Sequence, residues 1–253
     1  MIMGFAFRYC SVLLSILILS PAMCSNAEYY YSRATYFGSP KCKLANPTGA
    51  CGYGEYGMTI NNGDVSGVSH TLWKNGTGCG ACYQVRCKNN PHCSEDGTNI
   101  IVTDYGEGHY TDFILTASAY AKMAQSNMAS ALYSYGVVDV EYKRIPCTYS
   151  SYNLVLKVHE HSKNPSYLAV IPLYQAGVSD INSMEVWLED CKEWRAMRRV
   201  YGTVYDLENP PMGVITVRIQ VSTNGETKWV QLTNVIPTEW KAGATYDTSI
   251  QLN

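Results

Sequence analysis

Short runs in which apolar and polar residues alternate dominate the second half of the chain. Alternation places successive side chains on opposite faces of a strand, so it predicts half-buried β-strands rather than helices. Turn-forming residues at 162–165, 175–177, 209–211 and 223–225 separate the runs at intervals typical of an antiparallel sandwich of seven or eight strands. The predicted strands cover residues 152–159, 167–174, 183–188, 213–221 and 228–232.

The first half also has mainly β character, with glycine-rich connections at residues 49–54 and 76–80. One helix is predicted over residues 118–131, where small and flexible apolar side chains would pack against the strands. The predicted strands cover residues 29–37, 81–87, 99–104, 111–115 and 137–144.

The first 27 residues have the features of a signal peptide. Arg8 is their only charge, residues 11–19 form an apolar run, and Pro21 precedes small residues before a cut after Ala27. No later stretch approaches the roughly 20 apolar residues needed to cross a bilayer. Export is therefore expected. The formal net charge of −2 becomes −3 when Arg8 is removed, which favours neither nucleic acid nor a membrane surface as partner.

Eight cysteines remain once Cys10 and Cys24 leave with the leader, and paired sulfurs are the expectation for an exported chain. Zinc is the alternative, because Cys79 and Cys82 have the spacing of metal ligands. A structural zinc site usually needs a second close pair, and Cys87 and Cys93 lie six residues apart, so disulfides are favoured. Every remaining cysteine except Cys191 precedes residue 148, which predicts domains over residues 28–148 and 149–253.

Six short motifs occur in order on both sides of this boundary, at residues 49–54, 78–83, 102–104, 142–147, 164–169 and 235–240. Together they resemble the expansin superfamily. The resemblance implies a six-stranded double-psi β-barrel similar to family 45 endoglucanases, followed by an immunoglobulin-like β-sandwich that binds carbohydrate. It also implies binding to plant cell walls and their loosening without detectable hydrolysis.

The resemblance also implies the disulfide pairing Cys51–Cys79, Cys82–Cys147 and Cys87–Cys93. Cys42 and Cys191 have no family partners, and a bond between them would join the two domains. The His-Phe-Asp motif of the family is absent, and residues 105–109, Tyr-Gly-Glu-Gly-His, follow the Val-Thr-Asp motif. Both departures point to the plant expansin-like B branch.

Hydrolysis of a glycosidic bond with inversion needs an acid and a base about 6.5–9.5 Å apart. The related hydrolases carry the base on the first barrel strand, and residues 29–37 contain no carboxylate. Ile114 takes the position of the acid, so no catalytic residue is expected. Asp112 would point to the same strand face as Ile114 and line the groove. Alternatively, it would be a solvated turn residue. Asp104 would line the groove, or cap a turn. The resemblance adds Thr35 and Tyr36, although such a pair is also ordinary strand composition.

Sugar binding in the second domain needs flat aromatic faces, because the C–H faces of pyranose rings stack on them. The resemblance places Tyr167, Trp194 and Tyr201 at or near one row. Alternating apolar neighbours favour a core position for Tyr174, Trp187 and Trp229 instead. The basic residues around Trp194 alternate with acidic ones, so a solvated mixed patch is expected rather than a pectin site; they are Lys192, Arg195, Arg198 and Arg199.

These features predict a secreted, monomeric cell-wall protein that binds polysaccharides such as cellulose or xyloglucan and loosens their noncovalent contacts without hydrolysis. No cofactor, metal, nucleic acid or membrane is expected. The alternative is an endo-β-glucanase with an appended carbohydrate-binding domain, and the missing base disfavours it. A single-domain ligand-binding or defence protein is disfavoured by the second domain. Asn75 begins an Asn-Gly-Thr sequon, so we expect it to be glycosylated.

Overall fold

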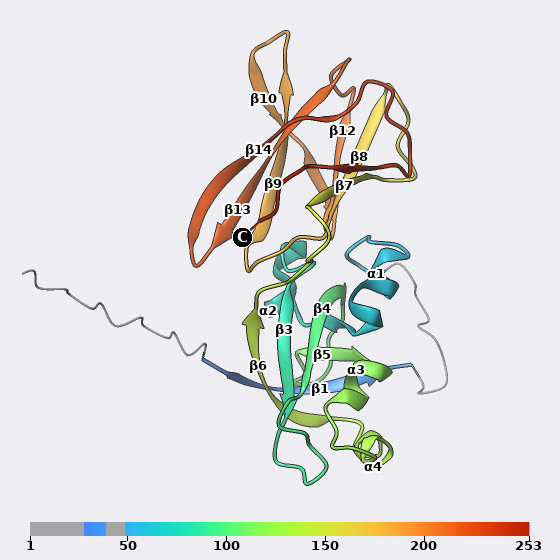
Figure 1. The fold of residues 1–253 in the computed structure, drawn as a ribbon, viewed down its shortest axis with the longest axis vertical. Helices are drawn as coiled ribbons and strands as arrows, with labels where there is room; N and C mark the ends of the chain where they lie inside the picture. Colours follow the sequence, from blue (N-terminus) through green and yellow to red (C-terminus); the bar gives the residue numbers. More distant parts are fainter. Residues whose placement is uncertain (1–27, 39–48, 253) are drawn as a thin grey trace, which may run out of the picture.

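The fold is that of a computed structural model, which describes residues 28–38 and 49–252. The predicted leader and Cys42 lie outside these residues. A β-barrel with short helices forms one half of the molecule and a β-sandwich forms the other (Figure 1). No helix within the described ranges is long and apolar enough to cross a membrane.

The first half closes into a six-stranded barrel, as predicted, in the order β1-β5-β2-β4-β3-β6. β1 pairs with β5, and β2 with β4, in parallel; the other neighbours are antiparallel. The sequence pattern did not reveal β2, whose four residues are all buried and so show no alternation. The strands are β1 Tyr30–Phe37, β2 Val65–Val68, β3 Cys82–Cys87, β4 Thr98–Tyr105, β5 Phe113–Thr116 and β6 Val138–Ile145.

The helix predicted over residues 118–131 is wrong in its extent, because the chain breaks it in two. Ala124 forms a β-bridge with Cys93, and the backbone N–H of Gln125 donates to the carbonyl of His92 at 2.8 Å. Asn127 then takes a left-handed φ of 65°. The fully buried Tyr120 and Met123 pack on the barrel as expected. The helices are α1 Tyr56–Thr59, α2 His70–Trp73, α3 Ala117–Lys122 and α4 Ala129–Tyr133.

The second half is a sandwich of two sheets with nine strands, more than the seven or eight predicted. The orders are β10-β9-β13-β14 and β11-β12-β8-β7-β15, and alternate residues such as Val217, Ile219 and Val221 of β13 point into the core between the sheets. The strands are β7 Val155–Val158, β8 Tyr167–Leu173, β9 Asp180–Leu188, β10 Glu193–Ala196, β11 Arg198–Tyr201, β12 Val204–Glu208, β13 Ile215–Thr223, β14 Glu226–Ile236 and β15 Thr245–Asp247.

The barrel contains three disulfides, and their pairing is the one that the resemblance implies. Cys79 and Cys82 belong to different bonds, so their sulfurs are not thiolate ligands for zinc, and that alternative fails. Cys191 is exposed in the turn between β9 and β10 without a partner among the described residues, and the bond to Cys42 stays a prediction. The bonds are Cys51–Cys79, Cys82–Cys147 and Cys87–Cys93.

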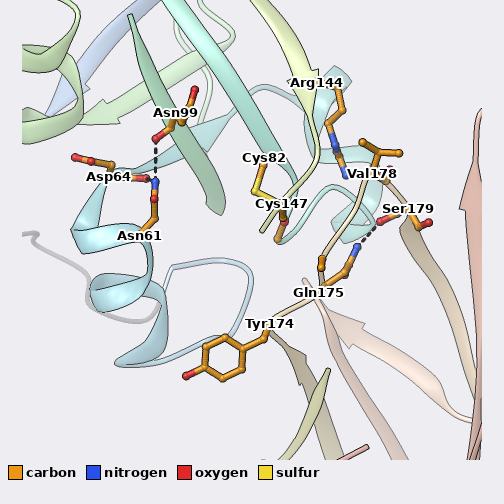
Figure 2. The surroundings of a disulfide bond; sticks show 12 residues. Asn61, Asp64, Cys82, Asn99, Arg144, Cys147, Tyr174, Gln175, Val178 and Ser179 are labelled. Carbon is orange, nitrogen blue, oxygen red and sulfur yellow. Dashed lines mark hydrogen bonds between the residues drawn. A yellow bond between two sulfur atoms is a disulfide. The ribbon is translucent and has the colours of Figure 1, made fainter. Parts of the chain in front are cut away.

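Direct backbone contacts join the barrel to the sandwich. Cys147 and Gly177 exchange two hydrogen bonds of 2.9 Å. Figure 2 shows the Cys82–Cys147 disulfide near Gln175, Val178 and Ser179 of the sandwich. Asp180 at the start of β9 receives hydrogen bonds from Arg144 at 3.0 Å and Lys74 at 2.9 Å. These two ion pairs cross the junction.

Apolar and aromatic packing completes the junction. Ala169, Ile171, Leu173 and Val204 of the five-stranded sheet belong to the same buried cluster as the barrel core. A group of tyrosines adds edge-on ring contacts across the boundary, with Tyr56 and Tyr174 having ring centroids 5.0 Å apart. The barrel and the end of the five-stranded sheet that faces it are therefore packed as one core.

Candidate functional site

Strand register places four residues in one row across the barrel surface: the predicted groove residues Thr35 and Asp104, with Ile114 and Gly67 between them. Thr35 of β1 lies opposite Ile114 of β5, Ile114 opposite Gly67 of β2, and Gly67 opposite Asp104 of β4. We call these four residues the barrel row. The residues beside them, such as Ala34 and Leu115, are fully buried, whereas Thr35, Ile114 and Asp104 are partly exposed, so these three side chains lie on the outer face of the barrel and Gly67 is covered between them.

Asp104 uses one carboxylate oxygen for the backbone and leaves the other without a described partner. Its Oδ1 accepts from the N–H of Ala50 at 2.6 Å and from that of Tyr105 at 2.8 Å. Asp104 therefore does cap the chain here, and the cap fixes the glycine-rich loop against β4. Because Oδ2 remains without a protein donor among the described residues, the same side chain can accept a hydroxyl of a ligand.

The Asp112 side chain accepts hydrogen bonds from two neighbouring segments, β1 and the residue that follows β2. Its Oδ2 accepts from the hydroxyl of Ser32 at 2.6 Å, and its Oδ1 accepts from the hydroxyl of Ser69. Its backbone also bonds to Arg33 and Ser69. These contacts make Asp112 a brace at the end of the barrel row.

Thr35 and Tyr36 point to different surroundings, as adjacent strand residues do. The Thr35 hydroxyl donates to the carbonyl of Gly136 at 2.9 Å. The Tyr36 ring lies between Tyr120 and Tyr133, with centroid distances of 4.7 and 5.0 Å. The structure therefore places Thr35 in the barrel row and Tyr36 against α3 and α4.

An aromatic pair that sequence reasoning missed stands at the mouth of β4. Tyr105 follows Asp104, is 41% exposed, and its ring centroid lies 5.6 Å from that of Trp73 in α2. A hydrogen bond to Glu107 raises the pKa of the Tyr105 phenol. The only signal in the sequence was a tyrosine at the end of a strand beside a predicted groove aspartate.

Tyr201 of the sandwich lies directly on the barrel loop that Asp104 holds. A Cβ atom on Gly52 would be 2.9 Å from the Tyr201 ring, and the N–H of Thr203 donates to the carbonyl of Cys51 at 3.1 Å. The Tyr201 hydroxyl is 3.3 Å from Nε2 of His159, and partial burial lowers the pKa of that histidine. A surface with Asp104 at one side and Tyr201 at the other thus crosses the domain boundary.

Tyr167 lies on the same outer sheet face as Tyr201. Its hydroxyl donates to Asp206 at 2.9 Å, and Arg198 donates to both oxygens of that carboxylate at 3.1 and 2.7 Å. These hydrogen bonds, with that of Arg198 the strongest, lower the pKa of Asp206. Register pairs Arg198 with Asp206 and Tyr201 with Val204, so all belong to the five-stranded sheet.

The prediction that Trp194 shares a row with Tyr167 and Tyr201 is wrong. Trp194 lies on β10, in the four-stranded sheet, opposite Trp187. The Arg218 guanidinium stacks 4.3 Å from the Trp194 ring centroid and 4.2 Å from that of Trp229. The chain crosses between sheets at the buried Met197, which separates β10 from β11.

The core positions predicted for Trp187 and Trp229 are wrong as well. Both side chains lie on the outer face of the four-stranded sheet, where Trp229 is 40% exposed. Tyr174 is half-buried at the domain junction, stacked 4.2 Å from Tyr152. The alternation that suggested a core position is equally satisfied by an outward one, because a strand has two faces.

The basic residues near Trp194 are mostly engaged with the protein. Lys192 pairs with Glu189, and Arg198 pairs with Asp206. Arg199 donates to the carbonyls of Gly202 and Ile181 at 2.6 and 2.7 Å. The mixture of charges is as predicted, but Arg198 and Arg199 are hydrogen-bonded to the protein and are not simply solvated as the sequence suggested.

The comparisons with known proteins agree on the class. The family described as the expansin C-terminal domain matches residues 154–237, and the double-psi β-barrel family described as lytic transglycolase matches residues 65–142. A relative called expansin-like B1 from Arabidopsis thaliana is 59% identical over 237 residues, which cover 94% of each chain. Expansin-like B1 from Oryza sativa subsp. japonica is 40% identical over 249 residues, which cover 97% of this chain and 96% of the relative.

The chain therefore belongs to the expansin family, whose members are generally non-hydrolytic. Within it, these relatives place the chain in the plant expansin-like B branch. Crystal structures of a Clavibacter michiganensis expansin, without ligand and as a mutant in complex with cellohexaose, share the fold. Each has a TM-score of 0.65 at 14% identity, covering 88% of this chain and 98% of the other.

Proposed function

We propose that this chain is an exported cell-wall protein that binds β-linked glucans along a surface shared by both domains, without hydrolysing them. The leader would be removed after residue 27, leaving domains over residues 28–148 and 149–253. The binding surface comprises Thr35, Asp104, Asp112, Trp73 and Tyr105 of the barrel with Tyr167 and Tyr201 of the sandwich. We call it the shared surface.

The observation that carries the proposal is the contact between Tyr201 and the loop at Gly52. This loop also contains Ala50, whose N–H fixes Asp104. Exposed aromatic rings on both sides of the boundary offer stacking faces to successive sugar units, and Asp104 offers between them a carboxylate oxygen that has no donor among the described residues. One long polymer can therefore contact both domains at once.

The same geometry supports binding without hydrolysis. The barrel row contains one carboxylate, Asp104, and the family resemblance assigns the position of the acid to Ile114. Asp112, the other carboxylate of the shared surface, has both oxygens hydrogen-bonded to serine hydroxyls. β1 contributes no carboxylate that could act as base. Hydrolysis with inversion would need two suitably spaced carboxyl groups. The release of noncovalent contacts between cellulose and matrix glycans remains as the proposed activity.

Extension of isolated plant walls under constant load tests the loosening activity, with boiled protein as control. Pull-down on insoluble cellulose tests binding separately. We expect binding by the folded protein and faster extension than with the boiled sample. Binding without extension would contradict loosening while leaving the binding surface intact.

Asn75 would carry an N-glycan. Its side chain is exposed, in the short segment Lys74–Gly76 after Trp73. A mass shift that peptide N-glycosidase removes, and that Asn75→Gln abolishes, tests this assignment in protein secreted from plant cells.

A further inference from the structure

A hollow of about 370 Å³ lies on the barrel beyond the end of the barrel row. It spans four neighbouring strands in the order β5-β1-β6-β3, counting the segments that flank them. Its lining is Tyr31, Ser32, Arg33, Lys88, Asn89, Tyr110, Asp139 and Val140. None of these residues takes part in the shared surface.

Two tyrosines at this hollow are among the most exposed large side chains of the described chain. Tyr31 is 80% exposed and Tyr110 is 78% exposed. Neither hydroxyl has a hydrogen-bond partner among the described residues. Exposed rings beside a concavity are what stacking on a pyranose ring requires.

The backbone holds Tyr110 in this exposed position. Its φ is +51°, which is uncommon for a residue other than glycine, and the N–H of Thr111 donates to the carbonyl of Gly108 to close the turn. Arg33 donates from Nε to the carbonyl of Tyr110 at 3.2 Å and from an Nη to the carbonyl of His109. Backbone conformations of this kind concentrate at functional sites.

The cations of the hollow are incompletely neutralised. Arg33 has no carboxylate within ion-pair distance in the described part of the chain, because its bonded partners are carbonyls. Lys88 lies 3.5 Å from Glu141, and that carboxylate already pairs with Arg86. Asp139 is the acidic group of the lining, and its Oδ2 accepts from Asn89 at 3.4 Å.

This combination matches a sugar unit that carries a carboxylate. Arg33 and Lys88 can bind the anionic group, Asp139 and Asn89 can bind ring hydroxyls, and the two tyrosines can contact the ring faces. Asp139, which lies opposite Arg33 across β1 and β6, supplies one negative charge against two cations, so the lining keeps a positive charge that a neutral sugar would not engage. The chemistry therefore favours a uronic-acid unit over a neutral hexose.

The hollow is also continuous with the shared surface. Ser32, in its lining, donates to Asp112, and Asp112 precedes Ile114 of the barrel row by two residues. We propose that the hollow is an end subsite of the barrel that binds a uronic-acid unit of an acidic matrix glycan. The proposal rests on the proposed function, since it extends the same glycan-binding surface.

Calorimetric titration of the mature chain with hexagalacturonate and with cellohexaose tests the subsite. We expect Tyr110→Ala and Tyr31→Ala each to weaken hexagalacturonate binding about fivefold, and Arg33→Gln to weaken it about tenfold and reduce its salt dependence. Cellohexaose binding should stay within twofold. The matched controls are Tyr135→Ala, another exposed tyrosine, and Arg195→Gln, an exposed arginine; both should leave both ligands unchanged.

Arg33→Gln could release the turn that it holds, which is why Tyr31, with no side-chain hydrogen bond in the described residues, supplies an independent variant. Wild-type protein that binds cellohexaose but not hexagalacturonate would overturn the subsite and leave the proposed function standing. Equal losses for both glycans in the tyrosine variants would overturn its selectivity for uronic acid. Failure of the wild type to bind cellohexaose would instead contradict the proposed function.

Discussion

The Cδ1 atom of Ile114 lies 2.7 Å from the point where a side chain on Gly106 would begin, so the isoleucine packs on the glycine backbone. Gly67 and Asp104 are the next positions of the barrel row. The family resemblance assigns the position of a hydrolase's acid to Ile114, and here its side chain packs against backbone. We therefore expect the barrel row to bind glycan without donating a proton to it.

The separation of Tyr201 and Trp194 onto different sheets predicts different effects on binding. Replacing Tyr201 with Ala should weaken binding to insoluble cellulose about fivefold, because loss of one aromatic stacking contact costs about 1 kcal/mol. Trp194→Ala should change it less than twofold. Binding isotherms of both variants measure this, and a larger loss for Trp194→Ala would show that the four-stranded sheet is the binding face.

The close packing of Gly202 on the barrel predicts a large stability loss on substitution. Gly202 has a φ of +47°, and a Cβ there would lie 2.3 Å from the carbonyl oxygen of Ala50. Gly202→Ala should therefore lower the free energy of unfolding by about 3 kcal/mol or more.

Gly225→Ala is the matched control, since its φ is +86° but nothing lies within 4 Å of a Cβ there. It should cost only about 1 kcal/mol from backbone strain. Urea unfolding of both variants measures the difference. Equal losses of unfolding free energy in the two variants would mean that the backbone at the junction between barrel and sandwich shifts to accommodate the added Cβ atom.

Arg218, stacked between Trp194 and Trp229, should stabilise the four-stranded sheet. Its guanidinium also donates to Glu185 at 2.7 Å. Arg218→Ala should lower the free energy of unfolding by about 1–2 kcal/mol, from lost cation–π contacts and an uncompensated half-buried carboxylate. Arg195→Ala, at an exposed position, should change it by less than about 0.5 kcal/mol. An Arg218 variant as stable as wild type would contradict this role.

The tyrosines at the domain junction predict a loss of stability at high pH. Burial raises the pKa of Tyr53 and Tyr56 far above the usual value of about 10. A raised pKa in the folded state means that their contribution is complete below about pH 10 and is lost as the pH rises further.

Tyrosinate absorbance followed together with near-ultraviolet circular dichroism tests this. Part of the tyrosine ionisation should coincide with unfolding above about pH 10. Ionisation of every tyrosine while the folded spectrum persists would show that the junction is open to solvent.

Much of the fold could be predicted from sequence, since alternation locates strands and six ordered motifs indicate the family. β2 was not predicted, because a strand buried on both faces shows no alternation of apolar and polar residues. The break between α3 and α4 was not predicted, because it comes from the β-bridge of Ala124 with Cys93, a residue distant in sequence. Local patterns report local structure, and these features depend on distant segments.

Some residues of the candidate site could be proposed from motifs, but the Trp73–Tyr105 pair and the assembly of the site could not. Asp104 and Tyr201 were identified from motifs, yet their proximity depends on how Gly52 and Gly202 pack across the domain boundary. The pattern around Trp229 could not tell an inward from an outward face. The pairing of Trp194 with Trp187 depends on where the chain crosses between sheets, which no single-sequence pattern reveals.

The most direct test of the account measures binding and product in one sample. The mature protein is incubated with insoluble cellulose, and separately with xyloglucan, and both the bound fraction and the reducing ends in solution are followed over time. We expect the protein to bind while reducing ends stay at the level of the boiled control. A steady release of reducing ends that Asp104→Asn abolishes would contradict it and identify an endo-β-glucanase.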